Sequence, residues 1–198
     1  LLIVPRFDGK QVIELSVHAG VWTSAALAAP PQEVPRLRTD LADMMAKFGL
    51  DPKGHTGKAL VHALTALPHD LLTGFADSDL ERVATAMVSL IDQPRPRLLL
   101  VPGALGRHLF AFAWLPRDAL STAVRLQIQA MLEAATGASV LDWSLEVEGG
   151  NLALIRFVLD IRETGAVPAE ALLEAQLQTL VRGWREAVEV ELGKGGHL

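Results

Sequence analysis

The stretch that decides the fold is Arg97-Leu-Leu-Leu-Val-Pro-Gly-Ala-Leu-Gly-Arg-His-Leu-Phe-Ala-Phe-Ala-Trp-Leu-Pro-Arg-Asp118, which predicts two strands joined by a tight turn. Residues 98–101 and 109–115 are apolar at every position, whereas a strand with one wet face would alternate. The glycines of Gly103-Ala-Leu-Gly106 supply the left-handed conformations that a hairpin needs. We therefore expect a central hairpin whose strands are buried on both faces.

Helices and strand pairs alternate after about residue 77. The expected elements are a helix over 77–92, the central hairpin, a helix that follows Pro116 and ends at Gly137, strands over 140–147 and 151–161, and a helix opened by Pro168. Antiparallel strand pairs with helices on one face make a two-layer sandwich. The predicted fold class is therefore α+β.

The strand over 140–147 alternates apolar and polar residues, so the polar residues are expected on a solvent face and Trp143 on the apolar face, where we assign it to the core or to an interface. A three-residue turn, 148–150, would set Asp142 opposite Arg156 on the solvent face. The alternation requires an odd loop length, because a shift by one residue exchanges the two faces.

The last helix has an apolar side that includes Trp184, which we assign to the core or to an interface. Glu170 and Glu174 point away from that side. The glycine-rich tail 193–196 is expected to be loose.

The first part of the chain predicts a hairpin followed by helices. Strands are expected over 1–4 and 12–22 around the turn signal Asp8-Gly9, with helices over 35–49 and 56–68. The chain begins directly as a strand without an initiating Met, so we expect it to be a piece of a longer polypeptide. A lone hairpin is marginally stable in water, so we expect this one either to dock on the rest of the chain or to be the stump of a domain whose beginning is missing.

Helices on one face of the central hairpin leave the other face to be covered. That face carries either Phe110, Phe112 and Trp114 or the alternate set Leu109, Ala111 and Ala113. Apolar patches of this size seldom stay bare. Our hypothesis is that another domain of the parent chain or a second subunit covers it.

The composition excludes several classes of function. Half of the 198 residues are apolar, the net charge is -5, and the 18 Lys and Arg residues are scattered, which argues against a nucleic-acid surface. The absence of Cys excludes disulfides and thiolate chemistry and fits a reducing, cytoplasmic compartment. The apolar stretches fall short of the roughly 20 residues that span a bilayer.

The chain contains no GxGxxG fingerprint, Walker loop, HExxH or GxSxG elbow. Gly54-His-Thr-Gly57-Lys58 resembles a phosphate loop only loosely, and a plain helix start is the stronger interpretation. His55, His62 and His69 recur every seven residues, but Pro68 breaks the helix that would align them. We therefore predict no metal, cofactor-binding or catalytic residues in this chain.

Two polar pairs are the best candidates for holding a small anion or zwitterion. Arg107 and His108 lie in the central turn, and Arg117 and Asp118 follow the second strand, where an Arg with an acid beside it could bind both ends of an amino acid. The competing interpretation is stronger: Asp118 caps the following helix, and both arginines are solvated.

Five stretches taken together resemble the N-terminal non-catalytic region of the large bacterial NAD-specific glutamate dehydrogenases. They are Val21-Trp-Thr-Ser-Ala25, Glu33-Val-Pro-Arg-Leu-Arg38, Leu50-Asp-Pro-Lys-Gly-His-Thr-Gly-Lys-Ala-Leu60, Ala113-Trp-Leu-Pro-Arg-Asp118 and Val140-Leu-Asp-Trp-Ser144. Each motif is weak alone, but their order and spacing are specific. Trp22 and Thr56 depart from the residues that are usual in the family.

The resemblance implies an ACT/ferredoxin-like regulatory domain within an enzyme that converts glutamate to 2-oxoglutarate and ammonium with NAD. It divides the chain into the end of a preceding α/β domain (1–52), an ACT-like domain with a helical lead-in (53–164) and a C-terminal helix (165–192). No position matches the catalytic lysine or the dinucleotide fold of the family, so no such residue is transferred. The implied partners are other domains of the same polypeptide, further copies in a homo-oligomer and an amino-acid effector.

The alternative is an independent small-molecule enzyme on a ferredoxin-like sandwich that uses His108, Arg117 and Asp118. The missing nucleophile, base pair and metal set count against it.

Overall fold

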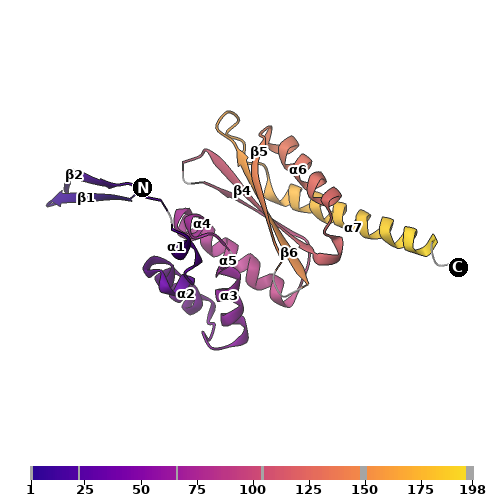
Figure 1. Ribbon diagram of the computed structural model, residues 1–198, viewed down its shortest axis with the longest axis horizontal. Helices are drawn as coiled ribbons and strands as arrows, with labels where there is room; N and C mark the ends of the chain where they lie inside the picture. The colour runs from indigo at the N-terminus through magenta and orange to yellow at the C-terminus, as the bar shows by residue number, and fades with distance from the viewer. Residues whose placement is uncertain (1, 22, 66, 104, 148–150, 195–198) are drawn as a thin grey trace.

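The computed structural model spans residues 1–198 and describes all of them except 1, 22, 66, 104, 148–150 and 195–198 (Figure 1). The strands are β1 (Leu2–Asp8), β2 (Gln11–His18), β3 (Arg97–Pro102), β4 (His108–Pro116), β5 (Val140–Glu146) and β6 (Leu152–Asp160). The helices are α1 (Ser24–Ala28), α2 (Pro35–Phe48), α3 (His55–Thr65), α4 (His69–Gly74), α5 (Asp77–Asp92), α6 (Thr122–Thr136) and α7 (Glu170–Lys194), with 3-10 turns η1 (Pro31–Glu33) and η2 (Arg117–Ala119).

The central hairpin forms one side of an antiparallel sheet with the strand order β3-β4-β6-β5, in which β3 is an edge strand and β4 an inner strand. Leu99 pairs with Phe112 between β3 and β4, and Ala113 pairs with Ile155 between β4 and β6. Gly106 adopts the left-handed conformation that closes the hairpin turn, with φ of 63°. The α+β class and the antiparallel sheet are therefore confirmed.

One face of the sheet is covered by α6 and α7, which together with it form the predicted sandwich. Leu109, Ala111 and Ala113 of β4 are fully buried on this face with Ile128 of α6 and Leu177 of α7. These contacts bury the apolar stripes of both helices.

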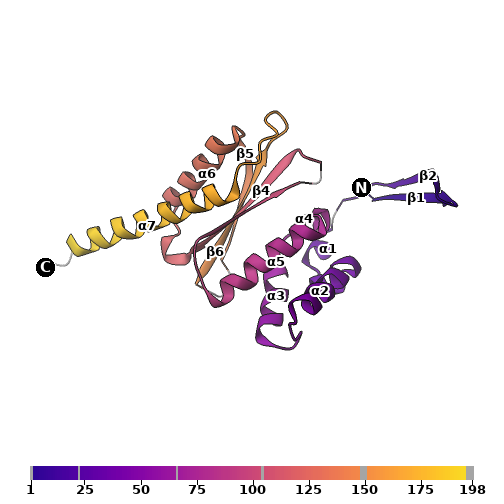
Figure 2. The same cartoon turned by 180° about the vertical axis from the view of Figure 1, so that it is seen from behind.

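The opposite face is covered by helices α2 to α5 of the same chain, which add a third layer (Figures 1 and 2). Phe112 and Trp114 are buried there, and the ring of Phe75 packs edge-on against Phe110 and Phe112 at 5.6 and 6.1 Å between centroids. The hypothesis for this face is corrected in one respect: no second subunit is needed, because the chain's own helical segment meets the aromatic set.

Edge strand β5 departs from the prediction. Trp143 lies opposite Phe157, on the face that α6 and α7 cover, yet it is 42% exposed, and Arg125 of α6 lies over its ring at 4.3 Å. The reason is position: β5 is an edge strand, so one side of its apolar row has no neighbouring strand beside it. The apolar row Leu141, Trp143, Leu145 and Val147 is exposed, so Trp143 is not a core residue, and its assignment to an interface stays a prediction.

The pairing of β5 with β6 is offset by two residues from the expected one. Ser144, and not Asp142, lies opposite Arg156, while Asp142 lies opposite Val158. An offset of two keeps every side chain on its face, so the structure preserves the alternation that the pattern required. A register shift between Val140 and Asp142 accompanies it, and the predicted turn 148–150 lies outside the described residues.

Local signals fix most helix ends. Helix α2 begins at Pro35 and ends at Gly49, which has φ of 63°, and α6 ends at Gly137 with φ of 65°. The cap of α6 is Ser121, whose Oγ accepts the Val124 N–H at 3.2 Å. The prediction that Asp118 caps this helix was wrong, because the 3-10 turn η2 intervenes.

Short elements and the chain ends differ further from the prediction. The sequence analysis missed α1 and α4, which have only five and six residues. Gly193 and Lys194 belong to α7 and not to a loose tail. The side chain of Trp184 is outside the described part of the structure.

Hairpin β1–β2 projects from the body of the molecule in both views (Figures 1 and 2). Every residue of the two strands is exposed, although apolar side chains occur along both. Gly9 closes the predicted turn with φ of 58°. The hairpin thus buries none of its apolar side chains within the described chain.

Two glycines make a matched test of how tightly the helical layer is packed. A Cβ at Gly57 would lie 2.2 Å from the backbone oxygen of Asp51, whereas Gly183 in α7 has open space around it. We expect Gly57→Ala to lower the free energy of unfolding by about 1–3 kcal/mol and Gly183→Ala to raise it by about 1 kcal/mol. Urea denaturation of both variants measures this, and equal effects would contradict the packing described here.

Candidate functional site: a polar junction across strand β3

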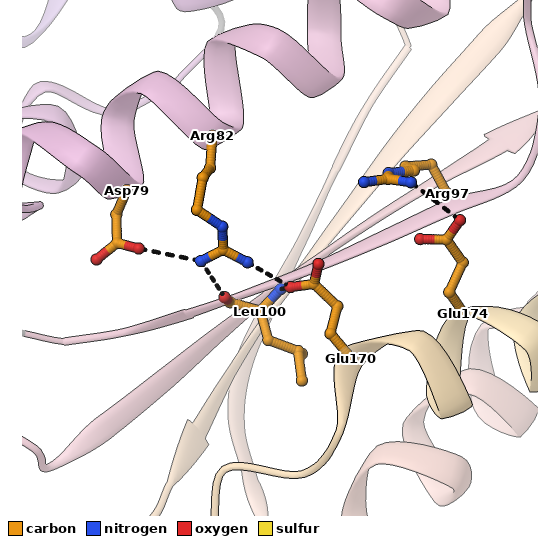
Figure 3. Close-up of polar contacts among 6 residues, drawn as sticks. All are labelled: Asp79, Arg82, Arg97, Leu100, Glu170 and Glu174. Carbon is orange, nitrogen blue, oxygen red and sulfur yellow. Dashed lines mark hydrogen bonds and ion pairs between the residues drawn. The ribbon is translucent and has the colours of Figure 1, made fainter.

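A connected group of charged side chains in the described part of the structure joins α5, β3 and α7. Arg82 of α5 donates to Asp79 Oδ1 at 3.0 Å, to the Leu100 carbonyl at 3.4 Å and to Glu170 Oε2 at 2.7 Å (Figure 3). Glu170, the first residue of α7, also accepts the Leu100 N–H at 2.8 Å. One ion pair therefore connects the helical layers on the two faces of the sheet, and both partners bond the strand between them.

The junction satisfies the outer edge of β3. An edge strand presents unpaired N–H and C=O groups, which attract further strands when left open. At Leu100 both outward groups are bonded to side chains of the chain itself, one to Glu170 and one to Arg82. These two hydrogen bonds therefore satisfy the outer edge of β3 within its buried stretch, Leu98 to Val101.

A second ion pair lies one helical turn further along α7. Arg97 donates to Glu174 Oε1 at 3.1 Å, and Gln178 donates to the same oxygen at 3.3 Å. The Arg97 Nε is buried and has no hydrogen-bond partner in the described structure. Next to these groups is a cavity of about 370 Å³ lined by Arg82, Arg95, Arg97, Glu81 and Glu170, among others.

The two sequence-predicted polar pairs do not converge. Arg107 and His108 are at the start of β4, whereas Arg117 and Asp118 are in η2 beyond its end. Nine residue steps along β4 separate His108 from Arg117, which is roughly 31 Å at about 3.4 Å per residue. Each pair therefore has its own surroundings, and no single small molecule contacts both.

His108 belongs to a small charged cluster with Asp160 and Arg162. His108 and Asp160 are register partners on β4 and β6. Hydrogen bonds from the Arg162 side chain, then from its backbone, hold the pKa of Asp160 at about 2, below its ordinary 3.8, and the charges of Arg162 and His108 act in the same direction. The same contact raises the pKa of Arg162. This cluster ties the end of β6 to the segment that follows.

The histidines and the glycine-rich segment have structural roles. His69 is buried, and its Nδ1 lies 3.0 Å from the Ala26 carbonyl, which it can bond only as a donor. His55 and His62 lie on α3. The described residues contain no group of three or more side chains placed to hold a metal ion. Gly54 and Gly57 form the first turn of α3 against the preceding loop.

Sequence analysis missed the junction. It placed Glu170 and Glu174 away from the apolar side of α7, which was wrong: both are partly buried on the helix face that carries Leu177, where they bond to β3. Arg82 is 88 residues away from Glu170, and nothing in a periodic pattern pairs charges at that separation. The available signal was weaker: Arg97 stands at the start of a strand that is otherwise apolar.

The arrangement of this α+β sheet and its helical support defines an ACT-type module. Residues 97–185 match the family model for the glutamate dehydrogenase ACT2 domain, and residues 34–93 match that for glutamate dehydrogenase helical motif 1. The two matches meet at the start of β3, so the junction joins the helical motif to the ACT2 domain. The chain belongs to the glutamate dehydrogenase family and carries these two parts of it.

Curated relatives agree with this placement. The chain is 30% identical over 187 residues to the NAD-specific glutamate dehydrogenase of Halomonas elongata, and 29% identical over 185 residues to that of Pseudomonas aeruginosa. Each alignment covers 92% of this chain, but only 12% and 11% of the relative. The enzyme of Mycobacterium tuberculosis is 27% identical over 146 residues, with 74% of this chain and 9% of the relative covered. The chain thus spans about an eighth or less of the length of these relatives.

None of the helices in the described part of the chain is both long and apolar enough to cross a membrane.

We expect Glu170→Ala to release α7 from β3 locally. Loss of the carboxylate leaves Arg82 with Asp79 as its remaining acidic partner and the Leu100 N–H without its acceptor, so the free energy of unfolding should fall by about 1–2 kcal/mol, allowing for partial solvent screening. Amide hydrogen exchange should accelerate at Leu100. The exposed Glu33→Ala is the matched control, and unchanged exchange at Leu100 would show that the junction does not hold the edge.

The lowered pKa of Asp160 gives a pH dependence of known sign. A carboxyl whose folded-state pKa is about 2, against an ordinary 3.8, contributes stability above about pH 4 and loses that contribution as the pH falls toward 2. We expect Arg162→Gln to return the titration midpoint of Asp160 toward 3.8, measured by carboxyl carbon NMR. Arg125→Gln should leave the midpoint unchanged. A midpoint that stays near 2 in the Arg162 variant would rule out this cause.

Proposed function

We propose that this chain is a regulatory and assembly segment of an NAD-specific glutamate dehydrogenase and is not itself catalytic. The parent reaction would convert L-glutamate, NAD and water to 2-oxoglutarate, ammonium and NADH. The observation that carries the proposal is the ACT2 domain joined to helical motif 1 by the Arg82–Glu170 contact. Relatives that share both parts are named NAD-specific glutamate dehydrogenases.

The described residues do not fit NAD, so no step through the cofactor is derived for them. A dinucleotide site of the usual kind needs a parallel strand-helix-strand unit with a glycine-rich first turn. Here every strand pair of the sheet is antiparallel, and the sequence lacks the fingerprint. NAD would supply hydride acceptance in another part of the parent enzyme.

The regulatory role would rest on the junction. Helix α7 begins at Glu170 and extends past the sheet to Lys194 (Figure 1). A ligand that favours one arrangement of this junction would shift the direction of α7, and with it whatever follows in the parent polypeptide. Such coupling requires different affinities for the two arrangements. Arg107 with His108, and Arg117 with Asp118, remain proposals for two separate effector sites.

The assembly role would use two exposed apolar surfaces. One is the projecting hairpin β1–β2, and the other is the β5 row of Leu141, Trp143, Leu145 and Val147. Exposed apolar rows of this kind mark contacts between domains or subunits. We propose a homo-oligomer in the cytoplasm, in which other domains of the same polypeptide cover part of these surfaces.

The domain division 1–52, 53–164 and 165–192 remains a prediction. It would assign α2 to the end of a preceding domain. In the structure Leu41 and Met45 of α2 share one core with Leu60 of α3 and Leu80 of α5.

The alternative, an independent enzyme that uses His108, Arg117 and Asp118, is less favoured. The length of β4 separates His108 from the other two, so the three side chains form no common site. No observation favours this second function.

We expect the 198-residue chain to show no reduction of NAD in the presence of L-glutamate. Absorbance at the NADH band measures this directly, with a complete glutamate dehydrogenase as the positive control. Measurable turnover by the chain alone would overturn the proposal, because every catalytic group would then have to lie within these residues.

A thermal-shift screen against the common amino acids, NAD and 2-oxoglutarate is the companion measurement. A rise in melting temperature with one amino acid, lost in the double variant Arg117→Ala with Asp118→Ala, would support an effector site there. Loss in the Arg107→Ala variant instead would assign it to the other pair. A clear rise in melting temperature with NAD would contradict the placement of the cofactor elsewhere. No shift with any of the compounds would reject the amino-acid effector and leave only the assembly role.

A further inference from the structure

We propose that the groove between helices α2 and α3 binds a free single-chain aliphatic anion, that is, a hydrocarbon chain ending in a carboxylate. The groove has a volume of about 900 Å³, within the range of about 300–1,000 Å³ that holds small ligands. Figures 1 and 2 place α2 and α3 on the side of α5 that faces away from the sheet. The site is separate from the junction and does not depend on the proposed function.

The two helices present one face each to the groove. From α2 come Arg38, Leu41 and Met45, at positions i, i+3 and i+7, and from α3 come Lys58 and Val61, at positions i and i+3. Leu41 and Met45 are largely buried and form an apolar floor. Arg38 and Lys58 are exposed cations at its border. Apolar floor and cationic rim thus come from the same two helix faces.

The charges of the lining select the ligand. Arg38, Lys58 and His62 line the groove, and the described lining contains no Asp or Glu. Among the described residues, the side chains of Arg38 and Lys58 form no ion pair. A carboxylate would receive charge-assisted hydrogen bonds from them. A zwitterionic amino acid fits poorly, because its ammonium group would find no carboxylate. The ligand class that fits this lining is an anion with an apolar body.

The wall of the groove is already formed. The loop before α3 packs so closely on its first turn that a side chain at Gly57 would meet the Asp51 backbone oxygen. Asp51 Oδ1 also accepts the Lys53 N–H at 2.9 Å, which fixes the loop itself. Pro52 of this loop and Lys58 both line the groove. The segment that loosely resembled a phosphate loop therefore positions a cation beside an apolar surface.

Decanoate, used as a monomer below its micelle concentration, is the probe for the 198-residue chain. Isothermal titration calorimetry should detect saturable binding, and methyl NMR should place it at Met45 and Val61, with the sheet residue Leu109 unshifted. The double variant Arg38→Gln with Lys58→Gln should weaken binding at least tenfold. Decanol, which has the same chain without the charge, should also bind at least tenfold more weakly.

Two further variants separate specific binding from general adhesion. Lys53→Gln removes a nearby exposed lysine that does not line the groove, so decanoate should bind it as tightly as the unaltered chain. Ala42→Phe adds a bulky side chain at an exposed lining position of α2, which should block the groove without disturbing the core. Circular dichroism confirms that each variant is folded.

Several outcomes would overturn the proposal. Equal affinity for decanol, or no effect of the double variant, would mean that the cations take no part. Methyl shifts outside the groove would place the ligand elsewhere. Binding to phosphatidylglycerol vesicles without binding of monomeric decanoate would mean that this face meets a membrane surface and not a free ligand.

Discussion

The structure depends on how one buried edge strand, β3, finds hydrogen-bond partners for its outward backbone N–H and C=O groups. Strand β3 is at the border of the sheet, yet Leu98 to Val101 are almost completely buried by helices on both faces. A buried N–H or C=O without a partner costs roughly as much as a lost hydrogen bond. The carboxylate of Glu170 and the guanidinium of Arg82 supply the partners at Leu100, and they bond each other while doing so.

This constraint links parts that belong to different family models. Arg82 lies in helical motif 1, and Leu100 and Glu170 lie in the ACT2 domain. A polar contact that three layers share can be rearranged more easily than the apolar contacts around it, because water and other ions can replace its partners. Under the regulatory role that we propose, the junction would be the place where a change in one domain reaches the other. The apolar clusters on the two sides of the sheet supply the stability that such a rearrangement leaves intact.

The surfaces left exposed are as informative as the buried ones. The hairpin β1–β2 and the β5 row expose apolar side chains, while the α2–α3 groove combines an apolar floor with unpaired cations. The hairpin and the β5 row are exposed apolar sheet surfaces, which other domains or subunits can cover. The groove is different because its charge pattern selects a ligand by chemistry. A segment of a large polypeptide can carry both kinds of surface, since contacts outside these residues remain available to it.

The sequence by itself determined what depends on neighbouring residues. A proline start and a glycine stop placed α2, a glycine stop placed the end of α6, unbroken apolar runs placed β3 and β4, and alternation placed β5 and β6, since these signals act within a few residues. The sequence did not place Trp143 outside, pair Arg82 with Glu170, or show that helices α2 to α5 cover the aromatic face. It also left the groove between α2 and α3 unseen. These features depend on which elements meet in space, and tertiary structure alone decided them, because an apolar stripe specifies that a helix packs but not against what.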